Sequence, residues 1–182
     1  EKLNELDKEF LPNNEEKILK VLVKDFKLEG NKRYNDEILK DLIKDNINKE
    51  LDYDALLNVT TEISNYYRSK GFLATSYLPP QDIKNGIVQI KITEAKLGKI
   101  AFNVDKTKKL NLSKEKIRKK ILYKVQDDGG LNISQLDKNI RNFNRTPGIN
   151  AVAQLEEGEE FGETDVIITA SNTETITGLS LF

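Results

Sequence analysis

The sequence predicts an α+β fold in which two similar units follow each other, each with the element order β-α-α-β-β, a three-stranded sheet and two helices. Apolar residues change from the period of a strand to that of a helix and back, twice along the chain. One offset of 76 or 77 residues relates the two halves, matching Phe26 to Phe102, Tyr67 to Phe143, Gly71 to Gly148 and Ile92 to Ile168. The length of 182 residues allows two small domains.

The first unit is predicted to open with a strand in Val21 to Tyr34, where β-branched and aromatic residues lead into the turn signal Gly30-Asn31. A helix follows with Asn35 as N-cap, and its apolar face is Ile38, Leu39, Leu42, Ile43 and Ile47. A second helix begins near Asp52 to Asp54 and ends at Gly71, and its apolar face is Leu56, Val59, Ile63, Tyr66 and Tyr67. Two strands close the unit, Phe72 to Leu78 and Gly86 to Glu94, with Pro79-Pro80 ending the first of them.

The second unit repeats this order. Leu97 to Val104 is predicted as a strand, and Ser113 as the cap of a short helix that carries Ile117, Ile121 and Leu122. The next helix has Asn132 as N-cap, with Leu131 and Leu136 placed as a hydrophobic staple, and its apolar face is Ile133, Leu136, Ile140 and Phe143. It ends before Pro147-Gly148, and the last two strands are Ile149 to Leu155 and Asp165 to Ser171. Small units of this size are expected to pack against each other, near Ala95 to Gly98.

The composition excludes several kinds of chemistry. The chain has no Cys and no His, which removes disulfides, cysteine nucleophiles, thiolate zinc sites and imidazole bases. Carboxylates are numerous, but no pattern predicts two of them converging in a cleft, and no glycine-rich phosphate loop occurs. We therefore expect no catalytic, metal or cofactor site. The absence of Met predicts a processed product or a fragment, and either of these can have lost targeting signals.

Charge is polarised along the second unit although the net charge is only −1. The segment from Lys96 to Lys124 contains eleven basic residues and two acidic ones, Asp105 and Glu115. Residues 156–165 contain six acidic residues and no basic one. These segments are solvated surface or steer a charged partner. The run from Glu156 to Glu160 lacks the alternating ligands of a calcium loop, so a solvated turn is the preferred interpretation.

Several strings resemble the two-partner secretion outer-membrane transporters, the TpsB proteins. In the first unit Tyr67 to Phe72, Leu78 to Ile83, and Gly86 to Ile90 with Glu94 are similar to their first POTRA domain. In the second unit the similarity to their second POTRA domain lies in Phe143 to Gly148, Leu155 to Glu159 and Gly162 to Val166. Phe143 stands where that family usually has Leu, and Glu157 and Phe161 stand where Pro is common.

The resemblance implies two tandem POTRA domains in the periplasmic part of an outer-membrane protein. Its domain plan is a linker at 1–20, POTRA domains at 21–96 and 97–172, and the start of a truncated C-terminal β-barrel at 173–182. The implied partners are that barrel and an exported TpsA-type exoprotein, an adhesin, cytolysin or toxin, which is received unfolded through its amino-terminal secretion domain. Whether a plug helix precedes Glu1 stays open.

The mechanism expected from the residues is strand addition, because a small sheet has exposed edges on which an extended client can pair its main chain. In the family's layout the middle strand is an edge of the sheet, so the candidate strands for pairing with a client are Phe72 to Leu78 and Ile149 to Leu155. The alternative for either strand is an ordinary half-buried edge strand that binds no client. The candidate partner-binding residues are Phe72, Ala74, Ser76, Ile149, Ala151, Ala153, Arg145, Lys119 and Lys120, and the structural motif residues are Gly71, Leu78, Pro79, Pro80, Gln81, Pro147 and Gly148.

Two other functions stay open on the sequence. The same POTRA fold serves in the barrel-assembly machinery, although the string from Leu78 to Ile83 favours two-partner secretion. A module of another class would bind nucleic acid through Lys106 to Lys124, but Tyr123 is the one aromatic residue among those lysines and the acidic segment repels phosphate.

Overall fold

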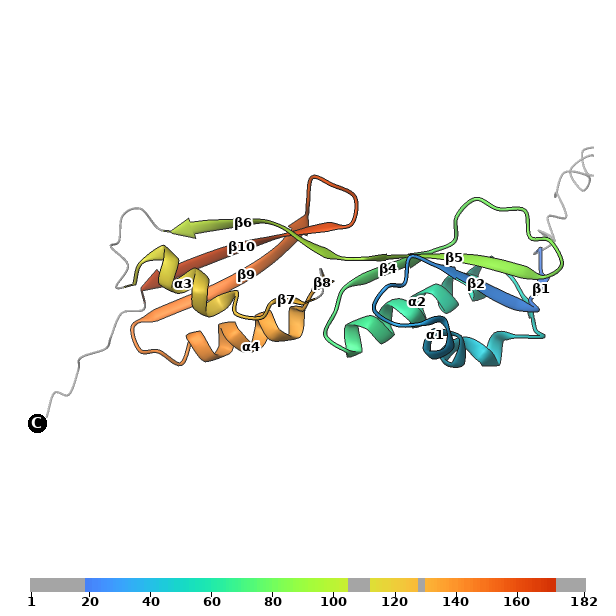
Figure 1. The fold of residues 1–182 in the computed structure, drawn as a ribbon, viewed down its shortest axis with the longest axis horizontal. Helices are drawn as coiled ribbons and strands as arrows, with labels where there is room; N and C mark the ends of the chain where they lie inside the picture. The colour runs from blue at the N-terminus through green and yellow to red at the C-terminus, as the bar shows by residue number, and fades with distance from the viewer. Residues whose placement is uncertain (1–18, 105–111, 128–129, 173–182) are drawn as a thin grey trace, which may run out of the picture.

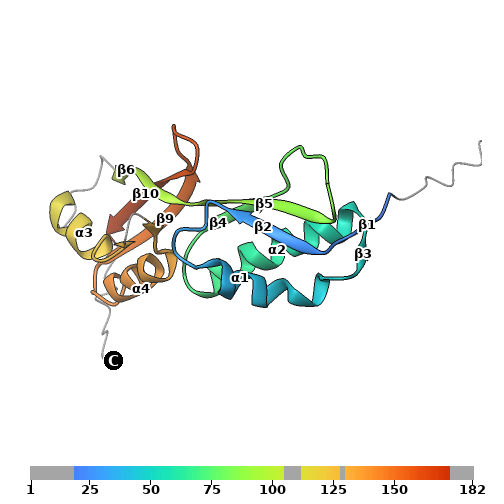
Figure 2. The same cartoon turned by 45° about the vertical axis from the view of Figure 1, so that its right-hand side comes forward.

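Two units of the same topology lie end to end (Figure 1) in the computed structural model, which describes residues 19–104, 112–127 and 130–172. Strand β5 of the first unit runs almost directly into β6 of the second, so one long ribbon spans both units, and Figure 2 shows it from another side. The predicted α+β class, with two β-α-α-β-β units, is confirmed. No helix in the described part of the chain is long and apolar enough to cross a membrane.

The first unit places two helices against one face of a three-stranded sheet of order β2-β5-β4. Strand β2 pairs parallel with β5, and β4 pairs antiparallel with it. Asn35 caps α1 as predicted, accepting from Ile38 N–H, and Asp52 caps α2, accepting from Ala55 N–H, at the predicted start of that helix. The elements are β1 (Val21–Leu22), β2 (Asp25–Glu29), α1 (Asp36–Ile43), the 3-10 helix η1 (Lys44–Asn46), β3 (Glu50–Leu51), α2 (Tyr53–Ser69), β4 (Ala74–Tyr77) and β5 (Ile87–Glu94).

The second unit repeats this plan with the sheet order β6-β10-β9. Strand β10 pairs parallel with β6 and antiparallel with β9. The predicted caps are again confirmed, because Ser113 accepts from Lys116 N–H and Asn132 from Gln135 N–H. The elements are β6 (Lys96–Val104), α3 (Lys114–Ile121), β7 (Gln126–Asp127), β8 (Gly130–Leu131), α4 (Ile133–Phe143), β9 (Ile149–Glu157) and β10 (Glu163–Asn172).

Three element boundaries predicted from the sequence were wrong. The first strand is not continuous from Val21 to Tyr34, because residues 21–22 leave the main sheet to pair with β3. The first helix ends at Ile43, so Ile47 lies beyond it, after a 3-10 turn. The strand predicted for Phe72 to Leu78 holds only Ala74–Tyr77, because Pro79 has no N–H to continue the ladder and Phe72 is used for contact with the second unit.

Each unit has its own apolar core between sheet and helices. Residues matched by the 76-residue offset occupy equivalent places: Tyr67 and Phe143 are both buried under their sheets, and Gly71 and Gly148 both adopt positive φ, +90° and +84°. A side chain at either glycine would strain the turn that follows the second helix of the unit. The fold of one unit is therefore built twice from the same pattern.

The predicted contact of the units near Ala95 to Gly98 is confirmed by main-chain hydrogen bonds. Leu131 N–H of the second unit donates to Ala95 C=O of the first at 3.0 Å. Ile133 N–H donates to Gly71 at 2.9 Å, where a side chain on the glycine would collide with Ser134. Because the ribbon passes through this region without a loop, the domain limits 21–96 and 97–172 stay a prediction.

Candidate protein-binding site

The sheet orders make the middle strand of each unit an edge, as the resemblance implied. Strand β4 borders the first sheet and β9 borders the second. An edge strand carries main-chain N–H and C=O groups that its own sheet does not pair. The two edges differ in how many of these groups are free.

The β4 edge is short and partly covered. Leu73 C=O faces β5, accepting from Ala95, so alternation turns the main-chain groups of Ala74 and Ser76 outward. The outward N–H of Ser76 donates to the Ser64 hydroxyl of α2 at 3.0 Å. At the start of the strand, Phe72 forms a bridge to Asn132 of the second unit. Few positions of β4 are therefore open to another chain.

The predicted β4 residues turn their side chains inward. Phe72 and Ala74 pack against the core of the first unit, and Ser76 is 9% exposed. The Ser76 hydroxyl is the one buried side-chain polar atom among the described residues without a hydrogen-bond partner. These three residues thus offer little side-chain surface to a partner, and the main-chain N–H groups of Phe72 and Ser76 are already bonded.

The β9 edge is longer and more open. Ala151 N–H donates to Asn144 Oδ1 at 2.7 Å and Asn144 Nδ2 donates to Ala151 C=O at 2.8 Å, so the main-chain groups of Ala151 face away from β10. By alternation those of Ala153 and Leu155 also face outward. Among the described residues no hydrogen bond reaches them from outside the sheet.

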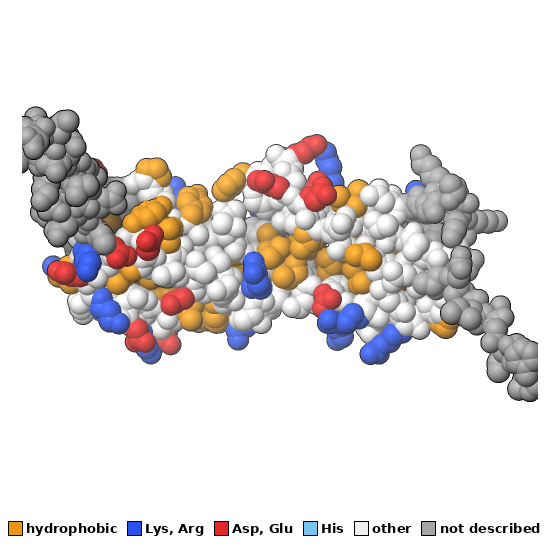
Figure 3. Space-filling model, turned by 180° about the vertical axis from the view of Figure 1, so that it is seen from behind, with side chains coloured by type: hydrophobic (Ala, Val, Ile, Leu, Met, Phe, Trp, Pro, Cys, Tyr) orange, Lys and Arg blue, Asp and Glu red, His pale blue; other side chains and the backbone are white. Residues whose placement is uncertain are grey.

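An apolar groove of about 660 Å³ runs between α4 and the β9 edge. Ile133, Leu136 and Ile140 line it from the helix, and Ala151, Ala153 and Leu155 line it from the strand. The predicted residues Ile149 and Ala151 are buried in the core, and Ala153 is half-buried. Figure 3 shows hydrophobic side chains gathered in the second unit, the right half of that view, below a group of acidic side chains.

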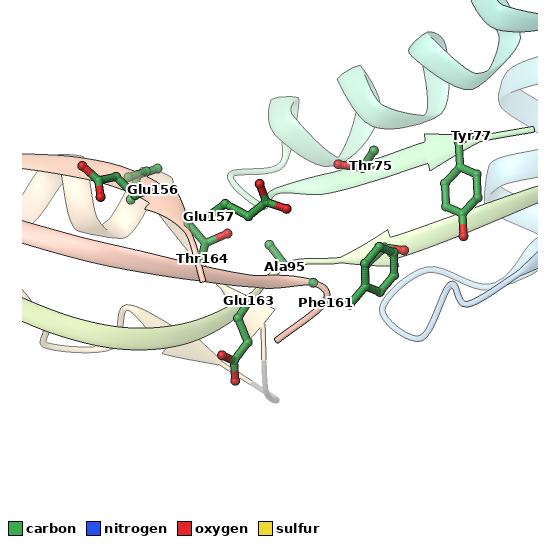
Figure 4. A pocket seen from close by; sticks show the side chains of 11 residues that line it. Thr75, Tyr77, Ala95, Glu156, Glu157, Phe161, Glu163 and Thr164 are labelled. Carbon is green, nitrogen blue, oxygen red and sulfur yellow. The ribbon is translucent and has the colours of Figure 1, made fainter. Parts of the chain in front are cut away.

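A second apolar pocket, of about 650 Å³, lies where the units meet (Figure 4). Thr75 and Tyr77 of β4 line it from the first unit, and Leu155 of β9 lines it from the second. Phe161, at the tip of the β9–β10 hairpin, is 82% exposed beside it. Leu155 lines both the groove and this junction pocket, so the two hollows adjoin at the end of the β9 edge.

The junction pocket has an acidic rim. Glu156, Glu157 and Glu163 line it, and all lie within the predicted acidic segment. Lys99 forms an ion pair with Glu159, which raises the pKa of the lysine. The main-chain N–H of Lys99 donates to the Asp165 carboxylate at 2.7 Å. The three acids of the rim have no ion pair among the described residues. A negative potential thus surrounds an apolar hollow.

The three predicted basic residues lie away from this acidic rim. Lys119 and Lys120 are exposed on α3, and Arg145 is exposed in the turn after α4. In the described part of the chain no hydrogen bond or ion pair joins either lysine to an edge strand, whereas Arg145 directly follows Asn144, which contacts Ala151. Residues 106–111 of the predicted basic stretch lie outside the described residues.

The motif residues fix turns and strand ends. Pro79 would face Gln89 if β4 continued along β5, but it has no N–H to offer. The Gln81 side chain takes its place, accepting from Gln89 N–H at 2.7 Å and donating to Gln89 C=O at 2.8 Å. Leu78 packs against the first core, Pro80 is exposed, and Pro147 precedes the positive-φ Gly148 at the start of β9.

Sequence reasoning missed three residues that organise the site. Asn144 and Ser64 cover the edge strands, and Arg33 joins the units: its guanidinium lies 3.7 Å from the Phe72 ring centroid and donates to Asp127 C=O at 2.6 Å. Asn144 lies within the stretch Phe143 to Gly148 that resembles the second POTRA domain, but the sequence assigned no role to it. An asparagine between a helix end and an edge strand was a usable signal, because its amide can pair with both groups of one peptide position.

The described residues contain no group of three or more carboxylates that could hold a metal ion. The hairpin predicted as a solvated turn, Glu156 to Glu160, is exposed apart from the half-buried Gly158. The features that remain are thus an open strand edge, an apolar groove and an acidic rim, which suit a protein partner.

Residues 21–95 match the family described as POTRA domain, ShlB-type. The heme/hemopexin transporter protein HuxB of Haemophilus influenzae (strain 86-028NP) is 30% identical over 141 residues, which are 75% of this chain and 24% of HuxB. The outer membrane transporter CdiB of Dickeya dadantii (strain 3937) is 23% identical over 109 residues, 59% of this chain and 18% of CdiB. The chain thus spans about a quarter or less of the length of these relatives.

Solved structures agree in fold. CdiB from Escherichia coli superimposes with a TM-score of 0.69 at 18% identity, covering 86% of this chain and 28% of CdiB. POTRA1-3 of the periplasmic domain of Omp85 from Anabaena superimposes with a TM-score of 0.63 at 15% identity, covering 84% of this chain and 66% of the Omp85 fragment. The predicted resemblance to two-partner secretion transporters is confirmed, and this family is one of transporter domains, not known as enzymes. Residues 21–95 thus match a ShlB-type POTRA domain, and both units have the fold of POTRA domains, which in these relatives are periplasmic parts of outer-membrane proteins.

Proposed function

We propose that this POTRA pair receives an unfolded exported protein by strand addition to the β9 edge and passes it to a β-barrel of the same protein. The observation that carries the proposal is the β9 edge itself. It is nine residues long, and its outward groups at Ala153 and Leu155 are unpaired among the described residues. An added strand would continue the hydrogen-bond ladder of the second sheet.

The comparison of the two edges favours β9 over β4. Strand β4 has four residues, Ser64 occupies its Ser76 N–H, and the Phe72–Asn132 bridge closes one end. On strand β9 the position at Ala151 is the one that a described side chain outside the sheet occupies, that of Asn144. A client of several residues thus finds more main-chain partners on β9.

The groove beside β9 supplies apolar contact. Side chains of an added strand that turn toward α4 would cover Leu136, Ile140 and Leu155. Burying apolar area contributes roughly 25 cal/mol per Å². This contact depends little on client sequence, as is needed for a receptor of unfolded chains.

The acidic rim at the end of β9 supplies a preference for charge. Glu156, Glu157 and Glu163 would attract a client whose basic residues flank the paired segment. Such charges raise the encounter rate more than the final affinity. The exposed bases Lys119, Lys120 and Arg145 would favour acidic client segments elsewhere on the surface.

The proposed partner is a TpsA-type exoprotein, bound through its amino-terminal secretion domain. The similarity to HuxB and CdiB supports this partner over a barrel-assembly client, because both relatives are transporters. The gene beside the one for this chain is the place to look for that exoprotein.

Proline substitution at the edge tests the proposal. In Ala153→Pro the lost N–H is one that β10 does not use, so the fold is expected to persist while an added strand is blocked. The matched control is Ala74→Pro, which removes an outward N–H from β4. Binding of the secretion domain, measured by fluorescence anisotropy, should weaken at least tenfold in Ala153→Pro and little in Ala74→Pro. Equal binding by both variants would contradict the assignment to β9.

A further inference from the structure

The amide of Asn144 occupies one peptide position of the β9 edge completely. Its Oδ1 accepts from Ala151 N–H at 2.7 Å and its Nδ2 donates to Ala151 C=O at 2.8 Å. These are the two hydrogen bonds that a residue of an added antiparallel strand would make at this position. Asn144 thus imitates the main chain of a paired strand.

The position of Asn144 allows its side chain to leave. It is the C-cap residue of α4, where the helix has ended, and its side chain is exposed. Its own main-chain N–H bonds to Ile140 and Asn142 and does not depend on the side-chain amide. Rotation of the side chain would therefore release Ala151 without unwinding the helix.

The cover on β4 is built differently. Ser64 lies in the middle of α2, is half-buried, and bonds Thr60 C=O at 3.2 Å as well as Ser76 N–H. It satisfies one main-chain group where Asn144 satisfies two. Ser64 is therefore a fixed part of the packing between α2 and β4, whereas Asn144 is held mainly by the groups that it covers.

We propose that Asn144 is a displaceable cover of the β9 edge, which sets the register at which a client strand begins to pair. This inference rests on the function proposed above. Pairing starts at Ala153 and Leu155, where the outward groups are free, and extends to Ala151 only after the Asn144 amide leaves. At Ala151 the client replaces two hydrogen bonds with two of the same kind.

The exchange has a consequence for affinity. With Asn144 present, the client gains little at Ala151 because each hydrogen bond formed there replaces one that is lost. Without the side chain, the client no longer has a competitor at this position. Removal of the amide should therefore tighten binding about tenfold, the factor that corresponds to 1.4 kcal/mol. The cover keeps the edge from pairing with unsuitable strands at the expense of affinity.

The probe for the test is a fluorescein-labelled peptide of alternating Val and Thr residues with two Lys residues at each end. A second version carries N-methyl groups on alternate amides, which removes the donors needed for strand pairing. Affinities are measured by fluorescence anisotropy with the 182-residue chain. The variants are Asn144→Ala and Asn144→Ser, with Asn142→Ala on the same helix as matched control and Ser64→Ala as the variant that uncovers β4.

The expected result is about tenfold tighter binding by Asn144→Ala and a smaller gain by Asn144→Ser. Asn142→Ala and Ser64→Ala should bind as the unaltered chain does, and the N-methylated peptide should lose the gain. Amide hydrogen exchange at Ala151 should become faster in both Asn144 variants, which reports that the edge has opened. If the peptide binds but both Asn144 variants bind no tighter than Asn142→Ala, the cover is refuted while strand addition stands. Failure of every variant and of the unaltered chain to bind contradicts strand addition and, with it, the role of Asn144.

Discussion

The Tyr67 hydroxyl of α2 donates a hydrogen bond of 2.7 Å to the Glu94 carboxylate at the end of β5. The same carboxylate oxygen accepts from the main-chain N–H groups of Lys32 and Arg33, at 2.9 and 2.8 Å. Glu94 therefore ties the β2–α1 loop and α2 to the strand that continues into the second unit. This places the side chain of Arg33 against Phe72 and Asp127.

Removal of the hydroxyl in Tyr67→Phe should lower the free energy of unfolding by about 1.5 kcal/mol. The ring stays in the core, so the loss reports the hydrogen bond to a charged acceptor. Urea unfolding followed by circular dichroism measures it. Tyr34→Phe is the control, because the Tyr34 ring packs on the rings of Tyr66 and Tyr67 and its hydroxyl has no hydrogen bond among the described residues. A loss no larger in Tyr67→Phe than in this control would show that the bond contributes nothing net.

Stability at alkaline pH should also depend on Tyr67. Burial first, and the hydrogen bond to Glu94 second, raise the pKa of this hydroxyl well above its usual value near 10. Above pH 10 the unfolded chain loses the proton and the folded chain keeps it, so the unfolded state binds fewer protons. The free energy of unfolding should therefore fall as pH rises from 10, with a slope of up to about 1.4 kcal/mol per pH unit from this group. In Tyr67→Phe the decline between pH 9 and 11 should be shallower, and identical slopes would contradict the assignment.

Much of the fold was predictable because its determinants are local. The caps Asn35, Ser113 and Asn132 and the glycines after α2 and before β9 are short-range signals, and each was found. The edge positions of β4 and β9 came from the family layout and are confirmed. Contacts such as Asn144 with Ala151 involve a side chain meeting main chain across a turn, and no periodic pattern marks them.

What the sequence could not predict depends on contacts between distant segments. Strands β1 and β3 are two residues each, too short for a periodic signal, and they pair across the first helix. Arg33 meets Asp127 across 94 residues of sequence, and no local pattern marks that contact. The acidic segment was recognised, but its position around a junction pocket follows only from the way the units meet.

Loss of the Arg33 guanidinium should loosen the junction of the two units. In Arg33→Ala the stack on Phe72 and the hydrogen bond to Asp127 disappear, while the main-chain bonds of Leu131 to Ala95 and of Ile133 to Gly71 remain. Spin labels at the exposed Glu62 and Lys138 should report a broader distance distribution by pulsed electron paramagnetic resonance. Arg145→Ala, which removes an exposed guanidinium, should leave the distribution unchanged. An unaltered distribution in Arg33→Ala would show that the main-chain contacts alone hold the junction.

The Gln81 amide should be worth more to stability than its surface position suggests. Gln81→Ala leaves both main-chain groups of Gln89 without their partner, and we expect a loss of about 1–2 kcal/mol in the free energy of unfolding. Gln81→Glu should lose less, because a carboxylate still accepts from Gln89 N–H. Gln154→Ala, an exposed glutamine on β9, is the control. Urea denaturation of the three variants measures these losses. Equal midpoints for Gln81→Ala and Gln154→Ala would show that the hydrogen bonds of Gln81 with Gln89 add nothing to stability.

Client binding should weaken with salt in a way that depends on the acidic rim. Glu156 and Glu157 border the junction pocket at the end of the β9 edge, and exposed charges separated by more than about 10 Å are largely screened at 0.1 M salt. The affinity for the lysine-flanked peptide should fall several-fold between 50 and 300 mM NaCl. In Glu156→Gln/Glu157→Gln the affinity at low salt should be lower and its salt dependence flatter, whereas Glu37→Gln/Glu62→Gln, which removes the same charge from the exposed helices of the first unit, should behave as the unaltered chain. Because the rim is proposed to attract basic residues of the client, a peptide with Glu in place of Lys should bind more tightly as salt rises. If the affinities of both peptides do not change with salt, steering by the rim is ruled out, and the β9 edge and its groove alone recognise the client.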